Sequence, residues 1–359
     1  MEARALASNR KIRVLIVDDS AFMRRAIERL ITQQPGIEVV GYATNGVEGV
    51  QKALELRPDV ITMDVEMPQL DGVSAVTEIM KTVPTPIIML STTTTEGAAT
   101  TIHALEAGAV DCLAKPSSLS TDLRAVGERL CAAIVRARDV RPRRILTLPR
   151  PVAVPLAPRP RDARPGAPSA SIVVIASSTG GPPALTQVVP HLPADLGAGV
   201  VVVQHMPPSF TGALARRLNE ISPLNVREAA DGDVISAGTV LVAPGDYHLT
   251  IDPRHVVRLT QAPTVHGVRP AVDVTLDSVA AVYGRRATVA ILTGMGKDGA
   301  AGAARVEGAG GNIIVQDEAT SVVWGMPKVA REQTQRSQEL PIDRIAAAIV
   351  RSSAQKALG

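Results

Sequence analysis

The sequence has little cysteine, few aromatic residues and no long apolar run. Only two cysteines, Cys112 and Cys131, occur among 359 residues, which excludes a disulfide framework and a metal cluster built on cysteine. No apolar run approaches the roughly 20 residues that span a bilayer, and Met1 to Arg10 lack the apolar core of a secretory signal. Membrane insertion is therefore not expected, and a reducing cytoplasm is the expected compartment.

Aromatic side chains make up 2% of the residues, which leaves few rings for stacking on nucleic-acid bases. The net charge of +3 conceals one strongly basic segment. Residues 141–170 hold seven arginines against one acidic residue, a local net charge of +6, so the rest of the chain sums to −3. Eight prolines in the same segment indicate an extended, solvated linker. No specific nucleic-acid partner is expected.

With 45% hydrophobic and 20% charged residues, the chain is of the globular class, and its length suggests roughly two or three domains. We place an N-terminal domain at 11–130, a Pro/Arg-rich linker at 131–170 and a C-terminal domain at 171–355. Both domains alternate short apolar runs with helical patterns, which is typical of parallel sheets covered by helices. Ligands of such α/β sheets bind beyond the carboxyl ends of the strands. The polar residues that follow the apolar runs are therefore the candidate site residues.

Four apolar runs of the N-terminal domain end in polar residues that could act together. These residues are Asp18 and Asp19, Asp64, Ser91, and Lys115 followed by Pro116. Three carboxylates at one sheet edge repel one another unless a cation neutralises them, and oxygen ligands suit Mg²⁺. A lysine and a hydroxyl at the same edge can hold the oxygens of a phosphoryl group that Asp64 accepts. Taken singly, Asp19 or Ser20 could instead cap a helix at 21–31.

These residues resemble the acidic pocket, phosphoacceptor, switch hydroxyl and phosphate-binding lysine of response-regulator receiver domains. The resemblance covers residues 11–130 and implies a flavodoxin-like fold with a parallel five-stranded sheet. It also implies Mg²⁺ at Asp18, Asp19 and Asp64, phosphorylation of Asp64 by a histidine kinase, and contacts from Ser91 and Lys115 to the phosphoryl group. Receivers usually carry an aromatic residue three positions before this lysine, where the sequence has Cys112.

Three apolar runs of the C-terminal domain lead to a hydroxyl, an imidazole and a carboxylate. Ser178 follows the run at 172–176, His205 follows the run at 200–203, and Asp298 lies in the loop after the run at 288–292. Ser178 as nucleophile, His205 as base and Asp298 as the acid that orients the ring would form a serine-hydrolase triad. Their order along the chain is not decisive, because a triad is defined by geometry.

Each member of this triad has an alternative interpretation. Ser177 is the rival nucleophile, and the glycines at 180–181 alone could form a turn that only packs or holds a phosphate. Among the other histidines, His248 follows a turn near another strand end and is a candidate for contact with the substrate or with the site residues. Asp298 could instead cap a helix that begins near Gly299.

Three segments resemble the signature segments of the chemotaxis protein-glutamate methylesterases. They are Ser178-Thr179-Gly180-Gly181, Gln204-His205-Met206-Pro207-Pro208 and Leu292-Thr293-Gly294-Met295-Gly296-Lys297-Asp298-Gly299-Ala300. A receiver, a linker and this domain, in that order, is the architecture of that family. The resemblance implies a doubly wound, mostly parallel α/β serine-hydrolase domain. It selects Ser178 over Ser177, because the family nucleophile immediately precedes Thr-Gly-Gly. It also implies that the backbone N–H of Met295 helps to form the oxyanion hole, with Thr179 in support. The family segment usually begins Gly-Ala, where this chain has Ala176-Ser177.

The same resemblance implies a function. The chain would hydrolyse glutamate methyl esters on the cytoplasmic helices of chemoreceptors, releasing methanol, and would deamidate receptor glutamines, with phosphorylation as the activating signal. Ester hydrolysis would need no cofactor. The expected partners are methylated chemoreceptors as substrates and a chemotaxis histidine kinase as phosphodonor. Two alternatives stay open: a receiver-controlled serine hydrolase that acts on another ester, and a receiver with a non-catalytic binding output.

Overall fold

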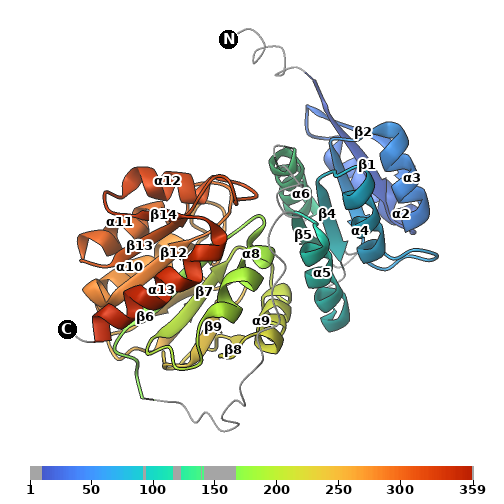
Figure 1. The fold of residues 1–359 in the computed structure, drawn as a ribbon. Coiled ribbons are helices and arrows are strands. Elements are labelled where there is room, and N and C mark those ends of the chain that lie inside the picture. The colour runs from blue at the N-terminus through green and yellow to red at the C-terminus, as the bar shows by residue number, and fades with distance from the viewer. Residues whose placement is uncertain (1–9, 92–93, 116–122, 139, 141–166, 358–359) are drawn as a thin grey trace. The chain divides into compact units, whose positions relative to one another are not determined.

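The computed structural model describes residues 10–91, 94–115, 123–138, 140 and 167–357 (Figure 1). The chain divides into two compact units, within residues 1–147 and 148–359, and each unit has its own parallel sheet. Most of the linker expected at 131–170 lies outside the described residues, as does Pro116. Within the described ranges, no helix is long and apolar enough to cross a bilayer.

The N-terminal unit is a five-stranded parallel sheet in the order β2-β1-β3-β4-β5, which confirms the flavodoxin-like arrangement. Its strands are β1 (Ile12–Val17), β2 (Ile37–Ala43), β3 (Val60–Asp64), β4 (Ile87–Ser91) and β5 (Asp111–Ala114). Its helices are α2 (Ala21–Ile31), α3 (Gly46–Leu56), α4 (Gly72–Thr82), α5 (Thr95–Ala107) and α6 (Leu123–Ala137). Helix α2 packs against α6, while α3, α4 and α5 pack against one another in sequence. Because helices cover both faces, β3 and β4 are buried along their whole length.

Helix α6 continues past residue 130, where the sequence analysis ended the first domain. Its buried stripe includes Cys131, Ile134 and Ala137, and the Cys131 thiol donates to the carbonyl of Leu30 in α2 at 3.8 Å. Packing of this apolar stripe stabilises the last turns of the helix. The residues from 131 to 137 are therefore part of the N-terminal unit.

The C-terminal unit is built on a seven-stranded sheet in the order β14-β13-β12-β6-β7-β9-β8, and all its neighbouring strands are parallel. The strands are β6 (Ile172–Ser177), β7 (Gly199–Gln204), β8 (Asn225–Glu228), β9 (Thr239–Val242), β12 (Ala287–Ile291), β13 (Asn312–Gln316) and β14 (Gln338–Leu340). Strands β10 (His248–Ile251) and β11 (Val257–Thr260) form a separate antiparallel hairpin.

Helices cover both faces of this sheet, as the doubly wound prediction requires (Figure 1). Helices α8 (Gly181–Val188), α9 (Phe210–Ile221) and α13 (Ile342–Ala357) lie on one face. Helices α10 (Val272–Tyr283), α11 (Ala300–Gly308) and α12 (Met326–Gln333) lie on the other. Strand β6 has β7 on one side and β12 on the other, so the strand order reverses there. Ligands of such sheets bind beyond the strand ends at this reversal.

Candidate active site and phosphoacceptor pocket

The register of β6 and β7 brings Ser178 and His205 to neighbouring positions. Ser177 and Gln204, the last residues of the two strands, are partners in the parallel ladder. The backbone N–H of His205 then donates to the carbonyl of Ser177 at 3.1 Å. Ser178 and His205, which the sequence predicts to act together, therefore each follow the last residue of one of two adjacent strands.

A sharp turn carries the chain from Ser178 into helix α8. The N–H of Ser178 donates to the carbonyl of Thr293 at 3.0 Å, and its own carbonyl accepts the N–H of Gly181 at 2.7 Å. Gly180 adopts a left-handed φ of 75°, and a Cβ there would lie 2.6 Å from the Cβ of Val322. Only glycine meets both conditions. The turn places Ser178 at the N-terminus of α8, where free N–H groups and the helix dipole favour negative charge.

The His205 ring is held by Asp298. Nε2 of His205 lies 2.7 Å from Oδ2 of Asp298, and both side chains are largely buried. Burial alone would raise the pKa of Asp298, but the hydrogen bond from His205 and the N–H groups of Asp273 and Val272 lower it below its ordinary value. Asp298 is therefore held as a carboxylate.

Asp298 also caps a helix, although not the one considered in the sequence analysis. Its carboxylate accepts the N–H of Val272 at 2.7 Å and of Asp273 at 3.0 Å, in the first turn of α10. Helix α11 begins after Gly299 without a side-chain cap. The acid beside His205 thus fixes the start of α10.

The Ser178 hydroxyl is half-buried and makes no hydrogen bond to any described residue. The structure therefore places Ser178 next to His205 along the strand ends without joining the hydroxyl to the ring. Such contacts are often long before substrate binds.

Two N–H groups near Ser178 are free for an incoming oxygen. Within the described residues, the N–H groups of Thr179 and Met295 make no hydrogen bond. The loop that carries Met295 is fixed because the Gly294 carbonyl accepts the N–H of Met326 at 2.8 Å. A Cβ on Gly294 would lie 2.8 Å from the Cβ of Ser178, so this loop directly contacts the candidate nucleophile.

Sequence reasoning gave no role to three buried polar residues beside this turn: Gln204, Thr293 and Gln316. The Thr293 hydroxyl donates to the carbonyl of Thr179 at 3.0 Å and accepts the N–H of Val323 at 3.0 Å. The Gln316 amide oxygen accepts the N–H of Thr293 at 2.7 Å. A polar residue that closes an apolar run was the available signal, and all three residues have it.

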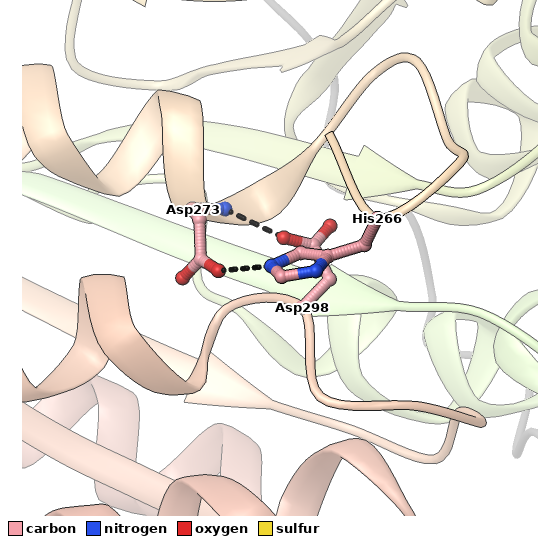
Figure 2. Close-up of side chains that lie close together, drawn as sticks. All are labelled: His266, Asp273 and Asp298. Carbon is pink, nitrogen blue, oxygen red and sulfur yellow. Dashed lines mark hydrogen bonds and ion pairs between the residues drawn. The ribbon is translucent and has the colours of Figure 1, made fainter. Parts of the chain in front are cut away.

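A second histidine lies close to the same acid. Figure 2 shows the His266 ring beside Asp273 and the N–H of Asp273 donating to Asp298. Nε2 of His266 lies 3.0 Å from Oδ2 of Asp273. The three side chains bring potential metal-ligand atoms within 4.8 Å of one another. Each carboxylate oxygen of Asp273 and Asp298, however, already accepts a hydrogen bond. Oδ1 of Asp273 accepts the N–H of Gly302 at 2.7 Å. Hydrogen bonds therefore account for this cluster.

His248 is not a substrate contact, contrary to one of the interpretations above. It is 1% exposed, and both its ring nitrogens have partners: Nδ1 accepts the N–H of Ala271 at 3.2 Å, and Nε2 donates to the carbonyl of Pro263 at 3.1 Å. The ring supports the residue that precedes α10. His248 is the first residue of the hairpin strand β10, and its side chain is therefore buried although a turn precedes it.

In the N-terminal unit, the predicted carboxylates and lysine do meet. Lys115 Nζ lies 2.9 Å from Asp18 Oδ2 and 2.6 Å from Asp64 Oδ2. Burial raises the pKa of Asp64 above its ordinary value, and the nearby Lys115 offsets this only in part. Burial would lower the pKa of Lys115, but Asp64 and Asp18 raise it. The Ser91 hydroxyl is buried and donates to the carbonyl of Gly97 at 3.1 Å.

The donor set of this pocket fits a divalent cation of the Mg²⁺ type. Carboxylate oxygens of Asp18, Asp19 and Asp64 lie within 4.8 Å of one another, and Asp19 is exposed. The pocket is open, with a volume of about 470 Å³, and Asp64 and Lys115 line it. Oxygen ligands with room for water are what Mg²⁺ requires.

Two family models match the chain: the response regulator receiver domain over residues 14–126 and the CheB methylesterase over residues 173–349. The protein-glutamate methylesterase/protein-glutamine glutaminase of Symbiobacterium thermophilum is 49% identical over 357 residues, which cover 96% of this chain and 97% of that protein. The protein of the same name from Thermotoga maritima is 47% identical over 342 residues, covering 94% of this chain and 97% of that protein. The crystal structure of the Thermotoga maritima CheB methylesterase catalytic domain matches with a TM-score of 0.49 and 46% identity, covering 50% of this chain and 97% of that chain.

Proposed function

The chain belongs to the protein-glutamate methylesterase/protein-glutamine glutaminase family, and on that premise we propose that Ser178, His205 and Asp298 form its catalytic triad. The chain is a hydrolase of glutamate methyl esters and of protein glutamines, under the control of a receiver domain. The hydrogen bond of 2.7 Å between His205 and Asp298, at the end of the strand next to the one that presents Ser178, is the observation that carries the proposal.

Acylation begins with the Ser178 hydroxyl. Because Nε2 of His205 is hydrogen-bonded to Asp298, Nδ1 is the ring nitrogen that takes the hydroxyl proton as Oγ adds to the ester carbonyl. Asp298 stabilises the imidazolium that forms. The N–H groups of Thr179 and Met295 hold the oxyanion. The imidazolium then returns its proton to the departing methoxide, and methanol leaves.

Deacylation repeats these steps with water as the nucleophile. His205 takes a proton from the water, the hydroxide adds to the acyl carbonyl, and the Ser178 oxygen leaves with that proton. The product is a glutamate side chain. A glutamine amide follows the same course with ammonia as the leaving group, so one site performs both reactions. Apart from the attacking water, every group that acts in these steps belongs to the protein.

The receiver supplies the control. Asp64 accepts the phosphoryl group from a histidine kinase, and Asp18, Asp19 and Asp64 would hold Mg²⁺, which would neutralise the charge of the phosphoryl oxygens. Lys115 and Ser91 contact the phosphoryl oxygens. The position of Lys115 Nζ, 2.6 Å from the Asp64 carboxylate, supports its role. Phosphorylation shifts the chain toward forms with higher hydrolase activity.

The substrates are methylated chemoreceptors, and the phosphodonor is the histidine kinase of the same chemotaxis-type system. The methylated helices of the chemoreceptors lie in the cytoplasm, and we place this chain there as well. Met295, in the loop beside Ser178, is 40% exposed, and this accessibility supports a macromolecular substrate.

Release of methanol from methylated receptor membranes, with and without a small phosphodonor, tests this function. Wild-type protein should release methanol faster with the phosphodonor, Ser178→Ala should release none, and Asp64→Asn should keep only the unstimulated rate. A small generic ester is assayed beside the receptor. Hydrolysis of the small ester alone would favour a different ester substrate, and hydrolysis of neither would favour a binding output.

A further inference from the structure

A row of buried polar groups crosses the base of the active site, and the proposed mechanism leaves it unused. Gln204 ends β7, Ser177 ends β6, Thr293 follows β12 and Gln316 ends β13, and none of them is more than 2% exposed. Buried polar side chains destabilise a fold unless every group is paired. These four residues therefore need hydrogen-bond partners inside the fold.

The Gln204 amide has one possible orientation. Its Nε2 donates to two backbone carbonyls, that of Ser178 at 3.0 Å and that of His205 at 3.0 Å. Carbonyls only accept, so the amide nitrogen must face them. The amide oxygen is then left for the Ser177 hydroxyl, which donates to it at 2.6 Å. A single side chain joins the backbone of the nucleophile to that of the base.

We propose that Gln204 is a positioning residue for hydrolysis and that Ser177 fixes the orientation of its amide. The inference rests on the proposed roles of Ser178 and His205. Nε2 of Gln204 keeps the two carbonyls at a set separation, and the Ser178 carbonyl, which also accepts the N–H of Gly181, has both lone pairs occupied. The turn at Ser178 is thereby held when the hydroxyl approaches the ring.

The packing around the amide supports this role. A Cβ on Gly181 would overlap the Gln204 amide oxygen and lie 2.9 Å from the Cβ of Ser177. Helix α8 therefore begins with glycine where the amide passes, because a side chain at position 181 would displace the amide. Ser177 differs from the alanine usual at this position of the family segment, so this chain gains a hydrogen bond at the rear of its nucleophile.

The test separates positioning from stability. Gln204→Met removes the donor and leaves the Ser177 hydroxyl buried without a partner, so it should lose both stability and activity. In Ser177→Ala/Gln204→Met the unpaired hydroxyl is gone, and the unfolding temperature should recover toward that of wild type. The kcat for methanol release should stay about 100-fold low at an unchanged KM, because the two strand ends are no longer joined. Gln187→Met, on α8, is the matched control and should leave kcat unchanged.

A second readout does not depend on the receptor. The rate at which a fluorophosphonate labels Ser178 should fall in parallel with kcat in the double variant of the full chain. Wild-type kcat and wild-type labelling in the folded double variant would overturn the proposal. A loss of activity that only follows the fraction of unfolded protein would overturn it equally. Labelling of wild type without methanol release would instead contradict the proposed substrate, and the role of Gln204 would still be read from the labelling rates.

Discussion

Oδ2 of Asp298 lies 2.7 Å from Nε2 of His205 and also accepts the N–H of Val272, at 2.7 Å. The carboxylate that holds the His205 ring therefore caps the helix α10 as well. The sequence suggested a cap on the helix near Gly299, whereas the helix that this carboxylate caps is α10. The ring of His205 is consequently fixed relative to a helix that begins far away in sequence.

The first prediction concerns the pH dependence of stability. The pKa of Asp298 lies below its ordinary value, so the unfolded chain binds the proton more tightly than the folded chain. The stabilisation is complete above the unfolded pKa of about 4 and is lost as the pH falls through the folded pKa. Asp298→Asn should cost about 1.5–3 kcal/mol at neutral pH and less in acid.

Urea unfolding followed by the fluorescence of Trp324, the only tryptophan of the chain, reports on the C-terminal unit. Asp277→Asn, an exposed position of α10, is the matched control. A difference between wild type and Asp298→Asn that stayed constant down to strongly acidic pH would contradict the prediction.

The second prediction concerns Gly294. An alanine Cβ there would lie 2.8 Å from the Cβ of Ser178 and 3.1 Å from its backbone nitrogen, and it would also overlap the sulfur of Met326. Gly294→Ala should lower kcat by about 100-fold because the proposed nucleophile, Ser178, is displaced. The cost in stability should be about 1–3 kcal/mol. Gly197→Ala, where a Cβ meets nothing within 4 Å, should have neither effect. Equal kcat values for the two variants would refute the contact.

The third prediction concerns the receiver. Lys115→Met removes the cation between two buried carboxylates, Asp18 and Asp64, and breaking such a buried pair costs about 3–5 kcal/mol. Calorimetry should show a lower unfolding temperature for the N-terminal unit in the presence of a chelator. Mg²⁺ should then raise that temperature more for the variant than for wild type, because the ion neutralises the same charges. Lys81→Met, which breaks an exposed pair with Glu78, is the control. An equal response to Mg²⁺ in all three proteins would contradict the prediction.

The fourth prediction ranks the two partners in Figure 2. His266 is partly exposed and, among the described residues, pairs with Asp273 alone, so His266→Ala should cost less than about 1 kcal/mol. Asp273→Ala leaves the N–H of Gly302 buried without an acceptor, which should cost about 1–3 kcal/mol. Trp324 fluorescence in urea measures both variants. The reverse order would mean that the His266 ring has a larger role than its contacts indicate.

The sequence predicted the residues whose place is set by a single strand. Asp64 and Lys115 follow apolar runs directly, and Ser178 and His205 come one residue later. Parallel strands bring such positions to one edge of the sheet. The structure adds what depends on several strands at once. The cap on α10 could not be predicted, because Val272 at the start of the helix and Asp298 are 26 residues apart and meet only in the folded chain. The amide of Gln204 is likewise oriented by carbonyls of two separate segments, and the burial of His248 depends on the hairpin that it begins.

Strand β6 lies where the order of the large sheet reverses, with β7 on one side and β12 on the other. The end of β6 therefore lies between the two halves of the sheet, β7-β9-β8 and β12-β13-β14. Strands β7 and β12 are the direct neighbours of β6, whereas the edge strands β8 and β14 are each separated from it by two intervening strands. Substitutions in the loops that follow β8 and β14 should therefore disturb Ser178 less than substitutions in the loops that follow β7 and β12.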